Sequence, residues 1–544
     1  MTFQRVVQTL CLAVFLVLMW LSAFPLIADI AVDAFLRLDP LILVGTWLSS
    51  RTLIPALWAA ALLLALSTIL GRFFCGHICP MGTTLDVTDR LIRGKFHDRS
   101  AKEKPTGPGV RLRQVKYQVL VFILAAGLLG VSWIFLASPL SLITRFYGLL
   151  IYPAVNFVTG KGLTWVRPLA DSLDWSVLAY AQVPQSRYLL QWVTMAILGA
   201  IFLCAVWSPR FWCRYLCPAG GLFALFSWRP LMRRGVSDDC IDCGKCQKDC
   251  PMDAIDTDPL VTCHGECIVC ETCVRVCPVN AVTFTTNRST RAERAIPFSA
   301  GRREMITASL AGVGSAIVTS TAISHPLVSA DYAKVAPRRL IRPPGALPER
   351  DLLARCVRCG LCMKACPTNT LQPLGLASGI TSFFSPKLLA RRGPCEPTCN
   401  VCGHVCPTGA IRPLPKADRI WAKVGTAFVL RRKCLAWEFD RKCLVCDEVC
   451  PYDAINLRRV PGLKEAVPFV DENRCSGCGF CEHHCPVQHQ AAIIVEPMNA
   501  IRIARGSYEE MGNSLGFSLK LKPKEALETF VPDSPDGLPP GFTE

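Results

Sequence analysis

The chain has 544 residues, a formal net charge of +17 and 51% hydrophobic residues. Its length exceeds what one hydrophobic core can organise, so three or four domains are expected. A mean hydropathy of +0.33 is high for a soluble protein and predicts membrane helices. Much of the positive charge lies beside apolar segments, where it sets membrane topology, so we expect no nucleic acid as a partner.

A membrane domain of four helices is predicted over residues 1–220. Four apolar stretches there are each close to the ~20 residues that cross the hydrocarbon of a bilayer. They cover residues 7–27, 53–70, 117–136 and 189–207. We expect the first to be retained, because it is too long for a cleaved signal peptide and lacks a small-residue cleavage site.

The distribution of basic residues predicts the sidedness of the loops. Residues 90–116 contain nine lysines and arginines, whereas residues 138–187 contain four. Because positively charged loops stay in the cytoplasm, the first loop is expected inside and the second outside. The protein is therefore predicted to be a multi-pass protein of the bacterial inner (cytoplasmic) membrane.

Two C-x3-C-P motifs follow the second and fourth predicted helices at their cytoplasmic ends, each after an aromatic-rich turn. Their cysteines are Cys75 and Cys79, and Cys213 and Cys217. The matching positions indicate a duplicated two-helix unit, and on a continuous helix each pair of thiols would share one face. Three interpretations stay open: a shared metal ion or further cluster, a reversible dithiol pair, and structural turns that form a docking surface.

Residues 235–290 are predicted to form a two-cluster ferredoxin domain in the cytoplasm. They contain two C-x2-C-x2-C-x3-C-P runs, which bacterial ferredoxins use to bind [4Fe–4S] clusters, whereas zinc ribbons use two well-separated cysteine pairs. The runs consist of Cys240, Cys243, Cys246 and Cys250, and of Cys267, Cys270, Cys273 and Cys277. By analogy with two-cluster ferredoxins, the fourth cysteine of each run binds the cluster of the other run.

The segment at residues 301–345 separates the two blocks of cysteine runs and begins with Arg302 and Arg303. Twin arginines before a weakly apolar stretch are typical of a twin-arginine export signal. Such a signal would carry a folded, cluster-bearing domain outward and add a fifth crossing. The alternative is an interdomain linker with an incidental arginine pair. Basic residues 334–342, which follow the stretch, weaken the topology signal.

Residues 346–544 are predicted to form a four-cluster polyferredoxin domain in the periplasm. The four runs consist of Cys356, Cys359, Cys362 and Cys366; Cys395, Cys399, Cys402 and Cys406; Cys434, Cys443, Cys446 and Cys450; and Cys475, Cys478, Cys481 and Cys485. The chain thus has six cysteine runs, numbered one to six in chain order, and six runs imply six [4Fe–4S] clusters. Two pairings of the four C-terminal runs stay open: run three with four and run five with six, or run three with six and run four with five.

The expected fold is an α-helical membrane bundle of four helices plus a fifth, carrying bacterial-ferredoxin-like α+β domains. Residues 1–290 resemble the NapH/MauN membrane ferredoxins in their helices, both C-x3-C-P motifs, two ferredoxin runs and the segment 138–145. Residues 301–544 resemble the NapG/MauM exported polyferredoxins in their twin arginines, the segment 342–345 and four runs. The chain thus resembles a fusion of the two families.

This resemblance implies a quinol dehydrogenase module that passes electrons between the quinone pool and a periplasmic cytochrome or reductase. It assigns no quinone site. Arg145 and Tyr147 lie near a predicted membrane boundary and are candidates, although an interfacial anchor is the other role for each. Related C-x3-C-P proteins act in cytochrome oxidase assembly or copper reduction, which is the alternative function.

Overall fold

The computed structural model describes residues 3–522, apart from residues 25, 27–29, 97–109, 182, 184, 257, 287–301 and 325–339. Part of the predicted cytoplasmic loop and most of the linker after the twin-arginine stretch lie outside these residues. The chain divides into two compact units. The first unit comprises residues 1–337, 345–388 and 400–413, and the second comprises residues 338–344, 389–399 and 414–544.

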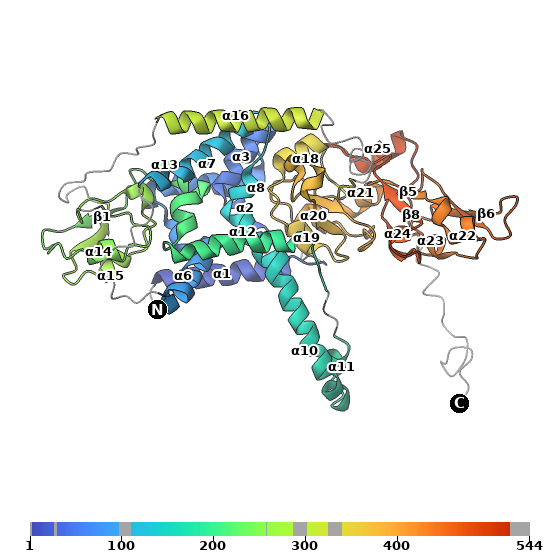
Figure 1. The fold of residues 1–544 in the computed structure, drawn as a ribbon, viewed down its shortest axis with the longest axis horizontal. Helices are drawn as coiled ribbons and strands as arrows, with labels where there is room; N and C mark the ends of the chain where they lie inside the picture. Colours follow the sequence, from blue (N-terminus) through green and yellow to red (C-terminus); the bar gives the residue numbers. More distant parts are fainter. Residues whose placement is uncertain are drawn as a thin grey trace. The chain divides into compact units, whose positions relative to one another are not determined.

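Helices dominate the first unit (Figure 1). The longer ones are α1 (Phe3–Leu21), α3 (Pro40–Ser50), α4 (Trp58–Leu70), α6 (Pro80–Phe96), α7 (Val110–Leu128), α10 (Tyr152–Ser172), α12 (Gln191–Leu203) and α16 (Arg302–Ser324). Shorter helices and turns are α2 (Ala34–Arg37), α5 (Phe73–His77), α8 (Ile134–Ala137), α9 (Pro139–Arg145), the π-helical turns η2 (Phe146–Ile151) and η4 (Trp212–Leu216), α11 (Ser176–Ala179) and α13 (Pro218–Phe226).

Among the described residues, two helices are long and apolar enough to cross a membrane: Phe3–Leu21 and the continuous helix Pro139–Ser172. Pro40–Ser50, Pro55–Leu70 and Gln191–Val206 are apolar but shorter. The expectation of four full-length spans is therefore not confirmed. Helix α4 begins only after a 3-10 turn that starts at Pro55, and α12 ends in another at Cys204. The sequence also did not predict helix α10, which lies in the expected outer loop.

Helix α16, which contains the twin arginines, packs along α7 in Figure 1. Gln118 donates to Glu304 at 3.3 Å near the start of the contact. Farther along both helices, a Cβ atom at Gly312 would lie 2.6 Å from the Phe122 carbonyl oxygen, so only glycine fits there. Glu304 lies beside Gln118, and the later residue Gly312 lies beside the later residue Phe122. Helix α16 therefore runs parallel to α7.

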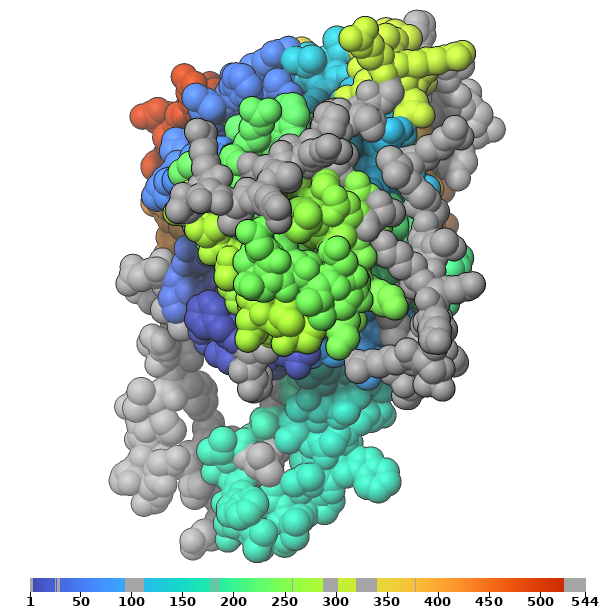
Figure 2. All heavy atoms as spheres, turned by 90° about the vertical axis from the view of Figure 1, so that its left-hand side faces the viewer, coloured from blue at the N-terminus to red at the C-terminus, as the bar shows by residue number. Residues whose placement is uncertain are grey.

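The first module, residues 233–285, has a ferredoxin-like arrangement of short elements. Strand β1 (Arg233–Val236) pairs antiparallel with β2 (Val282–Thr285), and α14 (Lys245–Lys248) and α15 (Thr272–Arg275) follow the two ligand loops. Its small core combines Ile255 and Val282 with cysteines of both runs. Figure 2 shows the face of the unit on which this module, in green and yellow-green, is exposed.

The first unit also holds the residues of the third run. Helices α18 (Glu349–Arg355) and α19 (Leu361–Ala365) flank its ligand loop, β3 (Leu371–Pro373) pairs with β4 (Pro386–Leu388), and α20 (Val401–His404) follows. A bridge between Ala346 and Ile411 closes a small apolar core. The predicted 346–544 domain is thus divided between the two units.

The second unit contains two antiparallel pairs. Strand β5 (Thr426–Val429) pairs with β8 (Ile493–Glu496), and β6 (Ile455–Arg458) pairs with β7 (Val467–Val470). Its short helices are α21 (Lys416–Trp421), α22 (Leu435–Phe439), α23 (Val445–Glu448), α24 (Phe480–His484) and α25 (Tyr508–Ser514). The core combines cysteines of runs five and six with two alanines, Tyr452 and a few aliphatic side chains, and so small an apolar core is expected where clusters replace apolar side chains.

Candidate iron–sulfur sites

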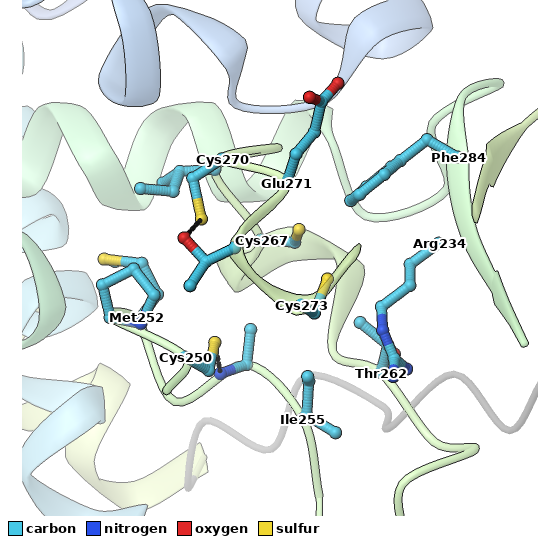
Figure 3. A pocket seen from close by; sticks show the side chains of 14 residues that line it. Arg234, Cys250, Met252, Ile255, Thr262, Cys267, Cys270, Glu271, Cys273 and Phe284 are labelled. Carbon is cyan, nitrogen blue, oxygen red and sulfur yellow. Dashed lines mark hydrogen bonds between the residues drawn. The ribbon is translucent and has the colours of Figure 1, made fainter. Parts of the chain in front are cut away.

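The second ligand loop of the first module and one cysteine of the first loop surround a common cavity. Figure 3 shows Cys250, Cys267, Cys270 and Cys273 around this space. Three thiols therefore come from one run and the fourth from the other, as the analogy with two-cluster ferredoxins predicts. Cys240 and Cys243 lie close to Cys246 in a second neighbourhood: burial, and to a smaller extent these two thiols, raise the pKa of the Cys246 thiol.

The same three-plus-one arrangement occurs twice in the second unit. The run-five cavity is lined by Cys434, Cys443, Cys446 and Cys485. The run-six cavity is lined by Cys450, Cys475, Cys478 and Cys481. Of the two pairings that the sequence leaves open, this geometry favours five with six.

Cysteines of the third and fourth runs also approach one another within the first unit. Burial raises the pKa of the Cys362 thiol, and the nearby thiols of Cys359, Cys356 and Cys406 raise it further. These four thiols again combine three residues of one run with the last residue of another. Within the described residues, no three His, Cys, Asp or Glu side chains are placed to hold a single metal ion. The cysteine groups fit the donor set of a [4Fe–4S] cluster.

Backbone amides donate to several of these sulfurs. Ala254, Ala281 and Ala454 donate to the thiols of Cys250, Cys277 and Cys450 at 3.3, 3.3 and 3.4 Å. In each case the donor lies four residues after a cysteine that precedes proline. Such N–H donors stabilise thiolates and raise the potential of a bound cluster. Sequence reasoning missed them, although the repeated Cys-Pro-x-x-Ala spacing was a usable signal.

The cysteines of the two C-x3-C-P motifs converge within the first unit. Cys75 lies in α5 and Cys213 in η4, whereas Cys79 and Cys217 directly precede the Pro residues that begin α6 and α13. Proline at the first helical position starts a new helix, so the helix does not continue through either motif. The four thiols are nevertheless neighbours: after burial, Cys213, Cys75 and Cys79 raise the pKa of the Cys217 thiol.

A buried arginine stands three residues before each motif. Arg210 donates to both oxygens of Asp86 at 2.6 Å and to the Cys75 carbonyl oxygen at 3.1 Å. Arg72 donates to the Gly265 carbonyl oxygen at 3.1 Å and to Glu266 at 3.0 Å. The Arg72 Nε and Nη2 atoms are buried and have no hydrogen-bond partner among the described residues. The sequence repeats Arg-x-x-Cys-x3-Cys-Pro, a signal that sequence reasoning did not use.

Models of a 4Fe–4S binding domain match residues 52–97, 190–237 and 401–415, and also residues 353–372. A model of a 4Fe–4S dicluster domain matches residues 441–489. The methylamine utilization ferredoxin-type protein MauM of Methylorubrum extorquens is 39% identical over 221 residues, which are 37% of this chain and 92% of that protein. The ferredoxin-type protein NapG of Escherichia coli is 34% identical over 180 residues, 32% of this chain and 77% of that protein.

The chain belongs to the MauM/NapG family of ferredoxin-type proteins. It is also similar to the putative electron transport protein YccM of Escherichia coli, with 28% identity over 38% of this chain and 50% of that protein. This MauM/NapG-type chain is thus an iron–sulfur electron-transfer protein. The NapH/MauN part of the predicted fusion stays a proposal.

In this MauM/NapG-type chain, Glu266 attaches the first module to the helices. Its carboxylate accepts hydrogen bonds from Arg72, from the Tyr117 hydroxyl at 2.9 Å and from Lys116. Nearby, a Cβ atom at Gly76 would lie 2.2 Å from the Ile268 carbonyl oxygen, so glycine is required. The ligand loop that carries Cys267 and Cys270 therefore packs directly against the first C-x3-C-P motif.

Replacement of Glu266 with Gln is expected to destabilise this attachment by about 3–5 kcal/mol, because Lys116 and Arg72 would remain buried without their counter-charge. Thermal unfolding and limited proteolysis of the first module measure the effect. Asp249→Asn, which changes an exposed carboxylate of the same module, is the control and should leave both unchanged. Equal behaviour of the two variants would contradict the attachment role.

The same carboxylate predicts a pH dependence. Burial alone would raise the pKa of Glu266, but Lys116 and Arg72 hold it below its ordinary value. A lowered folded-state pKa gives stability that is complete above the ordinary value and is lost as the pH falls through the folded-state value. The contribution of Glu266 to the attachment should therefore be lost on strong acidification.

The third run packs on the helices at another place. Lys364 is 4% exposed and donates to the carbonyl oxygens of Trp20 at 3.1 Å and Ser22 at 3.2 Å, and to that of Met19, at the end of α1. A cation at these carbonyls also complements the helix dipole. The Arg358 guanidinium lies 3.7 Å from the centre of the Phe135 ring.

Arg145 and Tyr147, the candidate quinone-site residues, have protein partners. Arg145 is buried, donates to the Phe135 carbonyl oxygen and lies 5.0 Å from the centre of the Phe384 ring. The Tyr147 hydroxyl is 3.1 Å from the Thr84 hydroxyl oxygen. Arg145 thus contributes to the packing of the third-run segment, and the structure assigns neither residue to a quinone.

Proposed function

We propose that this chain is a membrane-bound quinol dehydrogenase module that passes electrons from the quinone pool, through [4Fe–4S] clusters, to a periplasmic redox partner. One observation carries the proposal: the first C-x3-C-P motif, which contacts the first module, and the third run pack at opposite ends of one helix, α1. Gln8, near its start, donates at 2.9 Å to the Gly76 carbonyl oxygen, beside the first module. Lys364 of the third run binds the carbonyls at its end.

The length of α1 supports separation across a membrane. Nineteen residues at 1.5 Å each give about 28 Å, close to the ~30 Å of a bilayer's hydrocarbon. With a bilayer across this bundle, the first module lies in the cytoplasm and the third run on the periplasmic side. The parallel course of α16 beside α7 supports a fifth crossing in the outward direction.

The four C-x3-C-P cysteines are proposed to hold a further redox centre beside the first module. Arg210 interacts electrostatically with both Cys213 and Cys270, so the centre would neighbour a cluster ligand. The unpartnered Arg72 nitrogens favour an anionic occupant over a neutral pair of disulfides, because a buried N–H group needs an acceptor. Glu266, Arg72 and Arg210 would then hold the ligand loop and both motifs in fixed register.

Bound clusters would supply one-electron oxidation and reduction. The residues of this chain would position them, donate to their sulfurs and exclude water. Twenty-four cysteines in six runs are proposed as ligands, and the count of six clusters rests on those runs.

Anaerobic purification of the full chain followed by addition of menaquinol tests the proposal. We expect about 24 irons from six cubanes and a loss of visible cluster absorbance when quinol is added. Zinc as the dominant metal would contradict the cluster assignment. Fully loaded clusters that dithionite reduces and quinol does not would instead favour the alternative, a protein of oxidase assembly or copper reduction.

A further inference from the structure

An open cavity of about 630 Å³ lies in the second unit and contains none of the proposed cluster ligands. Residues 427–433 form one wall and residues 468–470 of β7 form another. Arg431, Arg432 and Lys433 all line this cavity, which we call the basic groove. Glu472 is the one acidic side chain among its described lining residues.

Some residues of the basic groove also line the run-five and run-six cavities of the same unit. Ala427 lines the groove and the run-six cavity, and its amide donates to the Cys475 sulfur at 3.4 Å. Val429 and Pro468 line the groove and the run-five cavity. A molecule in the groove would therefore be one layer of side chains from two proposed clusters.

The chemistry of the groove suits a protein partner with an acidic surface. Arg431, Arg432 and Lys433 are exposed, and the Arg431 guanidinium lies 4.3 Å from the centre of the Trp437 ring. Phe428, on β5, is 52% exposed although it borders the cavity. Arginine and aromatic side chains are enriched in protein interfaces, and clustered positive charge accelerates association with negatively charged partners.

We propose that the basic groove is the docking site of an acidic redox protein, which exchanges electrons with the clusters of runs five and six. The proposal rests on the function proposed above for its electron-carrying clusters, and it adds where the partner binds and what charge it carries. The contact is expected to be small and transient, as is usual for redox encounters.

The test uses the full chain, reduced with dithionite and freed of excess reductant, so that no quinol step is involved. Its oxidation is followed by stopped flow with two probes: the acidic haem domain of cytochrome b5 and the basic cytochrome c of horse heart. Arg431→Glu, Arg432→Glu and Lys433→Glu are combined in one variant. The control combines Lys416→Glu, Arg505→Glu and Lys520→Glu, three exposed basic residues of the same unit outside the groove.

At low ionic strength, the groove variant is expected to reduce cytochrome b5 at least about tenfold more slowly than the parent protein does. It is expected to reduce cytochrome c faster than the parent does. The control should keep the parent rates with both probes, and the advantage of the parent should shrink as salt is added. Equal rates of the two variants, or a slowing without salt dependence, would overturn the proposal. Iron content and visible spectrum, unchanged in both variants, separate this result from cluster loss. If the protein failed only to oxidise quinol, the proposed function would be contradicted and the docking proposal would not.

Discussion

Serine at any one of Cys75, Cys79, Cys213 or Cys217 is expected to abolish quinol-dependent reduction of the ferredoxin clusters. The four thiols are neighbours although they come from two distant segments. Loss of one member therefore disables a shared site, and double variants should be no worse than single ones. Reduction by dithionite should persist, because the six cysteine runs are untouched.

The measurement is cluster absorbance after quinol or dithionite is added, together with iron content. Cys204→Ser is the matched control, since Cys204 lies at the end of α12 outside both motifs. The control should retain quinol-dependent reduction. Four mild and additive effects would show that the motifs are structural turns.

Replacement of Arg302 and Arg303 with Lys is expected to trap the C-terminal block inside the cell. Twin-arginine export requires the arginine pair, and α16 begins at that pair. Protease added to intact spheroplasts should digest residues beyond about 330 in the parent protein and spare them in the variant, as expected for a block translocated on the signal. Clusters should remain intact, but transfer to periplasmic acceptors should stop.

Arg458→Lys with Arg459→Lys is the control for this experiment, because it changes another adjacent arginine pair that is exposed. The control protein should be digested like the parent. Protection of the C-terminal block in the unaltered protein would contradict export and place all six proposed clusters in the cytoplasm. That result would favour the alternative function, cytochrome oxidase assembly or copper reduction.

The cysteine runs made the electron-transfer class predictable, because their spacing is a local property of the sequence. The lengths of the apolar helices were less predictable. Apolar composition continues through Pro55 and Cys204, where the backbone changes to 3-10 turns. The pairing of run five with run six depends on which ligand loops fold against each other, and no local spacing encodes that choice.

The residues that attach the cluster segments to the helices could not be predicted either. Glu266 bonds Lys116 and Arg72, which are 150 and 194 residues away. Lys364 bonds the end of α1 across 342 residues at Ser22. In the sequence, Glu266 and Lys364 are ordinary charged residues within two positions of a cysteine. Only the tertiary structure gives each a buried partner, and buried charges need such partners.

The glycine contact between α16 and α7 has a consequence for how the protein operates. The proposed export signal, α16, is packed at Gly312 against α7 and is therefore suited to remain as an anchor rather than to be cleaved away. The proposed donor and acceptor blocks would then stay covalently joined at a fixed ratio of one to one. Joined partners meet at an effective concentration set by their tether, in the millimolar range for short flexible linkers. Electron passage between them would therefore be independent of how sparsely the protein populates the membrane.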